Sequence, residues 1–99
     1  MKVVIDGSTV AEASEAELVE IEGNWYFPPS SIVDGVLSPS ETPYTCPWKG
    51  VCAYQNVTTA AGTRNDGAWS YPAPDASAIK RVGKDFSGYV TFAKPVSFE

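Results

Sequence analysis

Prolines and glycines interrupt this chain at short intervals, and their spacing limits the secondary structure that it can form. The 99 residues include eight of each, and a proline inside a helix removes a backbone hydrogen bond and clashes with the preceding turn. No stretch of about 12 residues keeps the apolar spacing of an amphipathic helix. The sequence therefore predicts short strands joined by turns, with at most one or two short helical turns.

Two β-hairpins are predicted near the N-terminus. In residues 1–12, two β-forming runs flank Asp6-Gly7, a dipeptide that supplies the positive φ angles of a tight type I′ turn. In residues 18–27, the pattern predicts a second hairpin with its turn at Gly23-Asn24, and Pro28-Pro29 ends the returning strand.

The rest of the chain is predicted to form one structured loop and then more short strands. Prolines and a glycine punctuate residues 28–43, which predicts a loop with a helical turn at most. Residues 51–58 alternate as a strand does, residues 61–67 predict a turn, and residues 68–71 predict a short strand. Residues 73–82 fit a single helical turn or a loop, and residues 86–98 fit two strands around Lys94-Pro95.

Seven or eight short strands at this spacing predict a mainly β fold, an antiparallel meander that curls into a barrel or two small packed sheets. We expect one domain, residues 1–99, because a second core would leave each half too small to offset its lost chain entropy. Aromatic residues make up 12% of the chain, which favours a pocket lined by some of the rings.

The chain is acidic, with a formal net charge of −5. Nucleic acids and anionic membranes bind clustered lysines and arginines, so neither is an expected partner. The N-terminal apolar run is shorter than a signal peptide requires, and no run approaches a membrane span. We therefore expect a cytoplasmic protein in which the two cysteines, Cys46 and Cys52, are reduced thiols.

The stretch "TCPWKGVCAY", residues 45–54, concentrates the reactive side chains. Two cysteines without a histidine are too few for a zinc site, so we expect no metal and no cofactor. Cys46 could be a nucleophile whose pKa Lys49 lowers, although buried inert cysteine is the commoner outcome. Lys49 could contact an anionic or carbonyl group while Gly50 permits close backbone approach. The alternative is a solvated lysine beside a turn glycine.

Aromatic residues lie on the predicted strands around this stretch. A curled sheet that gathers them on one face would form a pocket wall, whereas alternating rings would divide between core and surface. The candidate ligand-binding residues are Tyr26, Trp48, Lys49, Gly50, Tyr54, Trp69 and Tyr71.

Four ordered segments resemble the small bacterial proteins of domain of unknown function 427: "WYFPPSSI", "LSPSETPYTCPWKGVCAY", "DGAWSYPAP" and "SGYVTF". The resemblance implies a β-tent or Mss4-like fold, in which two small antiparallel sheets pack at an angle. It implies site candidates without a reaction, because the function of the family is unassigned. The family's recurrent positions are here Tyr26, Phe27, Pro28, Cys46, Pro47, Lys49, Gly50, Tyr54, Trp69, Tyr71 and Pro72.

Three functions are compatible with these residues. Our first expectation is a small-molecule binding module with an aromatic-lined pocket and Lys49 as its polar contact. One alternative is a thiol-dependent enzyme that uses Cys46, so the sequence leaves open whether the protein is an enzyme. The other is a protein-interaction domain that exists as a monomer or a weak homodimer.

Overall fold

The computed structural model describes residues 1–99 and contains nine strands, one α-helix and two 3-10 turns, so the prediction of a mainly β fold is confirmed. None of the helices has the length and apolar character needed to cross a membrane. In chain order the elements are β1 (Lys2–Ile5), β2 (Ser8–Glu12), η1 (Glu15–Glu17), β3 (Val19–Ile21), β4 (Asn24–Tyr26), η2 (Pro29–Ser31), β5 (Leu37–Cys46), β6 (Gly50–Thr59), β7 (Gly62–Ser70), α1 (Ala76–Val82), β8 (Val90–Phe92) and β9 (Ser97–Phe98).

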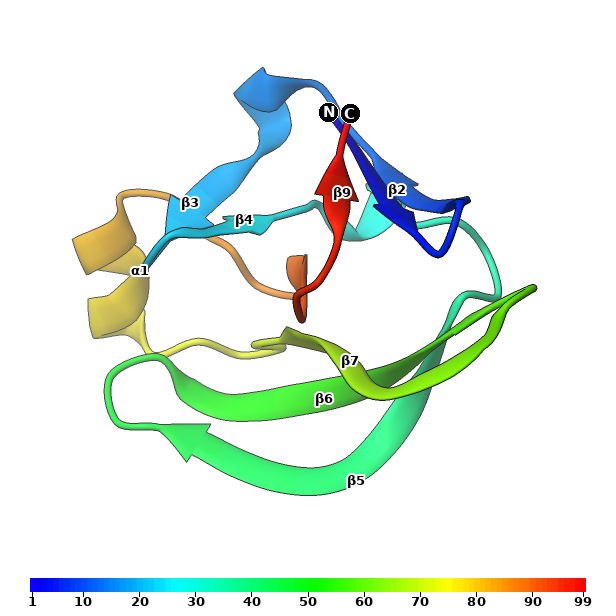
Figure 1. Ribbon diagram of the computed structural model, residues 1–99. Coiled ribbons are helices and arrows are strands. Elements are labelled where there is room, and N and C mark those ends of the chain that lie inside the picture. Colours follow the sequence, from blue (N-terminus) through cyan, green and yellow to red (C-terminus); the bar gives the residue numbers. More distant parts are fainter.

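The strands are arranged in two layers (Figure 1). The larger layer is an antiparallel sheet of four strands in the order β5-β6-β7-β8. The smaller layer is divided into two ladders, β2-β1-β9 and β3-β4. Reciprocal backbone hydrogen bonds of 2.8 and 2.9 Å between Phe27 and Val90 connect the end of β4 to β8. The two chain ends lie side by side because β9 pairs with β1.

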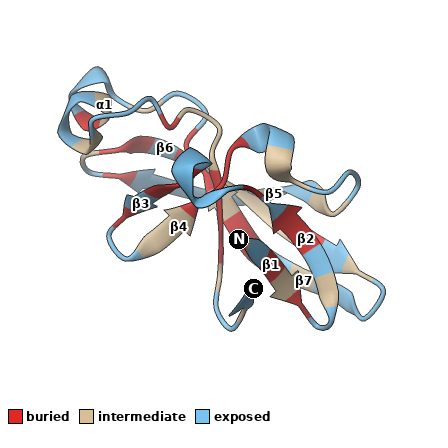
Figure 2. Cartoon of the chain, turned by 90° about the horizontal axis from the view of Figure 1, so that it is seen from above, coloured by how far each residue is buried: buried red, intermediate tan, exposed pale blue.

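Two apolar core clusters lie on opposite faces of the large sheet. Successive strand residues point to opposite faces, and on β7 Ala68 belongs to the first cluster while its neighbour Trp69 packs against the second. Figure 2 shows the buried residues as bands along the strands, whereas α1 is largely exposed. The first cluster contains Val3, Ile5, Val10, Ala11, Ala13, Leu18, Phe27, Val57, Ala68, Val90 and Phe92. The second contains Val19, Ile21, Tyr26, Cys46, Cys52, Tyr71, Ala78 and Phe86.

Both predicted hairpins are present, but the second turn was predicted one residue too late. Asp6 and Gly7 take φ angles of 50° and 83°, as a type I′ turn requires. In the second hairpin the turn is formed by Glu22 and Gly23, with φ angles of 54° and 80°. Glycine takes the second turn position in both hairpins, the position that it holds in the preferred Asn-Gly and Asp-Gly turns. Glu22 is thereby left at the first position.

The prediction of a loop across residues 28–43 is wrong from Leu37 onward, where β5 begins. Proline cannot donate to a ladder, so it is tolerated on an edge strand or at a bulge. Strand β5 satisfies both conditions, since it lies at the edge of its sheet and its register shifts between Pro39 and Pro43. The helical turn allowed in this region is present as η2.

The prediction of a turn at residues 61–67 is also wrong, because these residues belong mostly to β7. The turn lies at Ala60-Ala61 instead. A bulge accommodates the polar residues of β7: Asp66 has a φ of 54°, and its N–H donates to the Asn56 side-chain oxygen at 3.0 Å. The strands predicted at residues 51–58 and on either side of Lys94-Pro95 are confirmed by β6, β8 and β9. The seven-residue α1 is longer than the single turn expected within residues 73–82.

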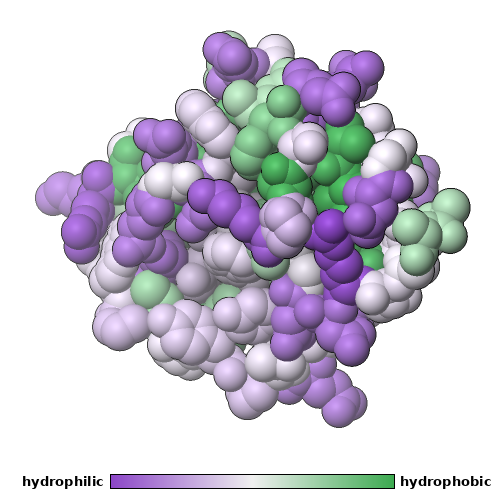
Figure 3. Space-filling view, viewed as in Figure 1, coloured by the Kyte–Doolittle hydropathy of each residue, from purple (hydrophilic) through white to green (hydrophobic).

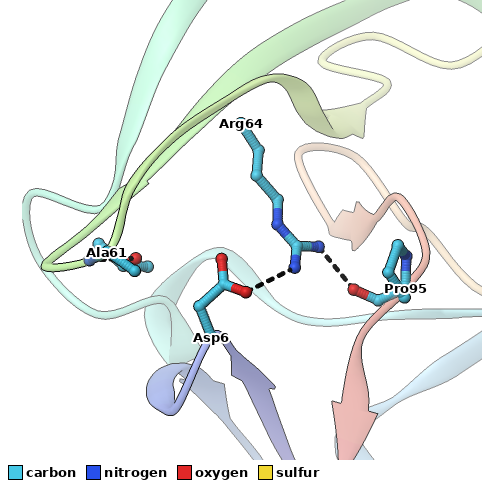
Figure 4. Close-up of polar contacts among 5 residues, drawn as sticks. Asp6, Ala61, Arg64 and Pro95 are labelled. Atoms are coloured by element: carbon cyan, nitrogen blue, oxygen red, sulfur yellow. Dashed lines mark hydrogen bonds and ion pairs between the residues drawn. The ribbon is translucent and has the colours of Figure 1, made fainter.

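Arg64 connects β7 to the smaller layer (Figure 4). Its Nη2 donates to Asp6 Oδ1 at 3.2 Å in the β1–β2 turn, and its Nη1 donates to the Pro95 carbonyl at 2.5 Å. Ion pairs at the surface contribute about 0–1 kcal/mol, so this contact joins the two layers but adds little to stability. A surface hollow of about 260 Å³ lies beside it, lined by Val4, Asp6, Arg64, Pro95, Val96 and Ser97.

Candidate functional site

A tight turn at residues 47–49 joins β5 to β6 and holds Lys49 against the start of α1. Cys46 pairs with Gly50 across this hairpin, and Gly50 has a φ of 110°, which favours glycine. The Lys49 carbonyl accepts a hydrogen bond from the Asp75 N–H at 3.0 Å. A Cβ at position 50 would lie 3.2 Å from Asp75 Oδ1. Glycine at position 50 therefore permits the close approach of Asp75, while its expected contact with a ligand stays a prediction.

The Lys49 side chain is buried, with only 6% of its surface exposed, so the alternative of a solvated lysine is wrong. Its Nζ lies 4.6 Å from the centre of the Trp48 ring and 5.3 Å from that of Tyr71. The ammonium also donates a hydrogen bond to Glu22 Oε1. Burying a charge is costly unless it is paired, and ring faces contribute roughly 0.5–2 kcal/mol. Glu22 and the two rings together supply this compensation.

Glu22 is a site residue that the sequence analysis missed. It occupies the turn between β3 and β4, and 57% of its side chain remains exposed. The sequence did show that Glu22 lies in the same hairpin as the candidate residue Tyr26. A local pattern does not indicate, however, which distant lysine a turn residue will contact. The pairing depends on the packing of β3-β4 over the β5–β6 turn.

The predicted aromatic residues do come together, in and around the second core cluster. The Trp69 indole Nε1 donates to Tyr26 Oη at 3.2 Å, and the rings of Tyr54 and Trp69 are 6.2 Å apart. Phe86 contacts Tyr26 and Tyr71 edge-on, each at 6.3 Å. These rings pack against one another, so in this structure they form a core with partly exposed edges.

Neither of the two surface hollows reaches Lys49. The larger hollow, of about 390 Å³, lies between β5 and β6. Tyr54 is the one candidate ligand-binding residue in its lining, which consists of Leu37, Ser38, Pro39, Ser40, Ala53, Tyr54 and Gln55. Figure 3 shows that the surface over β5 and β6 is of intermediate hydropathy, while apolar atoms gather over the smaller layer. A ligand of Lys49 would therefore need the cover formed by Glu22 to move.

The two thiols differ in their environment although both are buried and unpaired. Burial disfavours ionisation of Cys46, but the backbone N–H groups of Trp48 and Lys49 and the Lys49 ammonium outweigh it, so the pKa of Cys46 lies below its ordinary value. Burial raises the pKa of Cys52, and a hydrogen bond from Tyr71 only partly opposes this effect. Cys46 is therefore the thiol with the greater thiolate character.

Two cations, Lys49 and Arg81, lie close to the Trp48 ring. The Arg81 guanidinium carbon lies 4.4 Å from the centre of the Trp48 ring. Arg81 and Lys80 come from the last turn of α1. No group of three or more histidine, cysteine, aspartate or glutamate side chains gathers as metal ligands would. The site thus combines cations with aromatic faces.

The family model described as a domain of unknown function (DUF427) matches residues 1–96. The chain belongs to this family. No curated protein matches it. The DUF427 match includes every candidate residue discussed above, so the Lys49 site lies within the family domain. The family description assigns no activity, and the functional argument therefore rests on the chemistry of the site.

Proposed function

We propose that this DUF427 protein is a small-molecule binding module in which Lys49 is the polar contact and Trp48 and Tyr71 are part of the wall. The main support is the buried Lys49 ammonium, which has ring faces at 4.6 and 5.3 Å and a single carboxylate partner on an exposed turn. Apolar side chains often stabilise a core as well as a buried ion pair does. A buried charge in this position therefore favours a role in binding.

We also propose that the protein has a β-tent or Mss4-like fold and is located in the cytoplasm. Two antiparallel layers joined at one edge by the Phe27–Val90 bridge are compatible with a β-tent or Mss4-like fold. Free thiols at Cys46 and Cys52 are compatible with a reducing compartment such as the bacterial cytoplasm.

A thermal-shift screen of the wild type and Lys49→Met tests the binding proposal. Methionine keeps an unbranched apolar side chain but removes the charge. A ligand at about 100 times its Kd adds roughly 2.7 kcal/mol, which raises the Tm of a domain of this size by about 10 °C or more. We expect such a shift in the wild type and its loss in Lys49→Met. Lys94→Met, at an exposed lysine, should respond like the wild type, and hits that stabilise all three proteins equally would contradict the proposal.

A second candidate function, thiol-dependent catalysis by Cys46, is favoured by one observation. Burial of Cys46 disfavours the thiolate, but two backbone N–H groups and the Lys49 ammonium favour it more strongly, so the pKa of Cys46 is lowered. Backbone donors and a neighbouring cation are the features that activate cysteine nucleophiles. In this case Lys49 would act on the thiol, and the aromatic rings would position its substrate.

Alkylation kinetics with iodoacetamide test the reactivity of Cys46. At neutral pH we expect Cys46 to react severalfold faster than Cys52 because the pKa of Cys46 is lowered and that of Cys52 is raised. Lys49→Met should slow the reaction of Cys46 and move its pH profile upward. Peptide mapping by mass spectrometry separates the two sites. Modification of Cys46 only after denaturation would identify it as an inert core residue.

A further inference from the structure

We propose that the ligand of the Lys49 site carries a carboxylate group and that the Glu22 carboxylate occupies the place of this group in the unliganded protein. The inference rests on the proposed function, because it names the ligand class of the same site. It follows from the surroundings of one ammonium, from the exposure of its partner and from the distribution of positive charge.

The surroundings of the Lys49 ammonium define what the site accepts. Trp48 and Tyr71 offer ring faces, which attract a cation but do not neutralise it. The charge is neutralised by Glu22, whose Oε1 accepts a hydrogen bond from Nζ. A carboxylate oxygen thus satisfies the ammonium beside the two rings, and a charge-assisted hydrogen bond to such an oxygen is stronger than one to a neutral acceptor.

The Glu22 side chain can be displaced from Lys49 by a ligand. More than half of its side chain, 57%, is exposed, whereas its partner Lys49 is 6% exposed. It lies in a two-residue turn with positive φ, outside the β3–β4 ladder, which pairs Ile21 with Asn24. Glu22 can therefore rotate into water without breaking a strand hydrogen bond. A ligand carboxylate that took its place would restore the same contact with the ammonium.

Positive charge beside the site favours an anionic ligand with a flat body. The chain carries a net charge of −5. Nevertheless, the Arg81 guanidinium carbon lies 4.4 Å from the centre of the ring of Trp48, the residue that precedes Lys49. Guanidinium and indole groups both stack on planar groups. A small aromatic carboxylate matches this combination, so benzoate is a suitable probe.

Isothermal titration calorimetry with benzoate and with benzamide, its neutral analogue, tests the inference. The proteins are the wild type, Glu22→Gln and Glu20→Gln; Glu20 is an exposed acidic residue of the same hairpin without a contact to Lys49. If Glu22 holds the ammonium about nine-tenths of the time, removing its charge should tighten benzoate binding on the order of tenfold. Benzamide affinity and the Glu20→Gln protein should be unchanged. Adding Lys49→Met to Glu22→Gln should abolish the gain.

Several outcomes would overturn the inference. These are equal benzoate affinity in Glu22→Gln and the wild type, an equal gain for benzamide, or inorganic phosphate binding as tightly as benzoate. Glu22→Asp provides a second route if Glu22→Gln does not fold, because the shorter side chain keeps the turn charge but withdraws from Lys49, and it should also tighten benzoate binding. A neutral ligand that requires Lys49, found while carboxylates fail to bind, would refute the ligand class and leave the proposed function standing.

Discussion

Replacing Phe27 with alanine is expected to lower the free energy of unfolding by about 3–5 kcal/mol, which approaches the whole stability of many small domains. The Phe27 side chain is fully buried in the first cluster, and its ring meets Phe92 edge-on at 6.3 Å. Truncation removes this apolar contact and leaves a cavity at the backbone bridge to Val90.

Chemical denaturation and thermal melting measure this effect. At about 4–8 °C for each kcal/mol, the Tm should fall by at least roughly 12 °C. Val33→Ala is the matched surface control, since Val33 is 44% exposed, and its effect should stay within about 0.5 kcal/mol. A loss below about 1 kcal/mol for Phe27→Ala would contradict the described packing at the junction of the layers.

Raising the pH from 10 to 12 is expected to destabilise the domain by roughly 2 kcal/mol through Tyr26 alone. Burial raises the pKa of Tyr26 from 10.0 to about 12, although the hydrogen bond from Trp69 opposes this. In this interval the unfolded chain releases the phenolic proton and the folded chain keeps it, so stability falls as pH rises. The slope approaches about 1.36 kcal/mol for each pH unit midway between the two pKa values and is smaller at either end of the interval. Burial raises the pKa of Tyr71 as well, which adds to the loss.

Urea titrations at a series of pH values measure this dependence. Tyr26→Phe should make the decline between pH 10 and 12 less steep, because phenylalanine has no proton to release. The variant should start from a lower stability at neutral pH, by about 1–3 kcal/mol, since the Trp69 N–H loses its acceptor. The same slope in the variant and the wild type would show that Tyr26 does not titrate as the structure implies.

Local signals explain which parts of the fold could be predicted. Asp6-Gly7 specifies a tight turn by its own backbone preferences, so the first hairpin was found with its turn in place. The long strand β5 was missed, and only the end of β7 was predicted, because their prolines and polar residues are disfavoured locally. An edge position, a register shift and the Asn56 contact with Asp66 compensate for them, and these features depend on strand pairing over long distances.

The same distinction applies to the site. The composition of residues 45–54 pointed to Lys49, Gly50 and Cys46 because glycine, lysine and thiol chemistry can be recognised in a short segment. Their partners Glu22 and Arg81 come from another hairpin and from α1, and no local pattern connects them to Lys49. The aromatic residues were expected to gather on one face, but their packing into a core around Phe86 depends on the tertiary fold.

The indole N–H signals of the three tryptophans in a two-dimensional NMR spectrum test most directly whether ligands bind at Lys49. Trp48 lies at the site, Trp69 packs on the same cluster, and Trp25 packs against the other cluster. Variants of each tryptophan to phenylalanine assign the signals. When a ligand from the thermal-shift screen is added, we expect the Trp48 indole signal to shift strongly and the Trp25 signal to stay in place. In Lys49→Met the shift of the Trp48 signal should be lost. Ligand-induced stabilisation that leaves the Trp48 signal unmoved would contradict binding at Lys49.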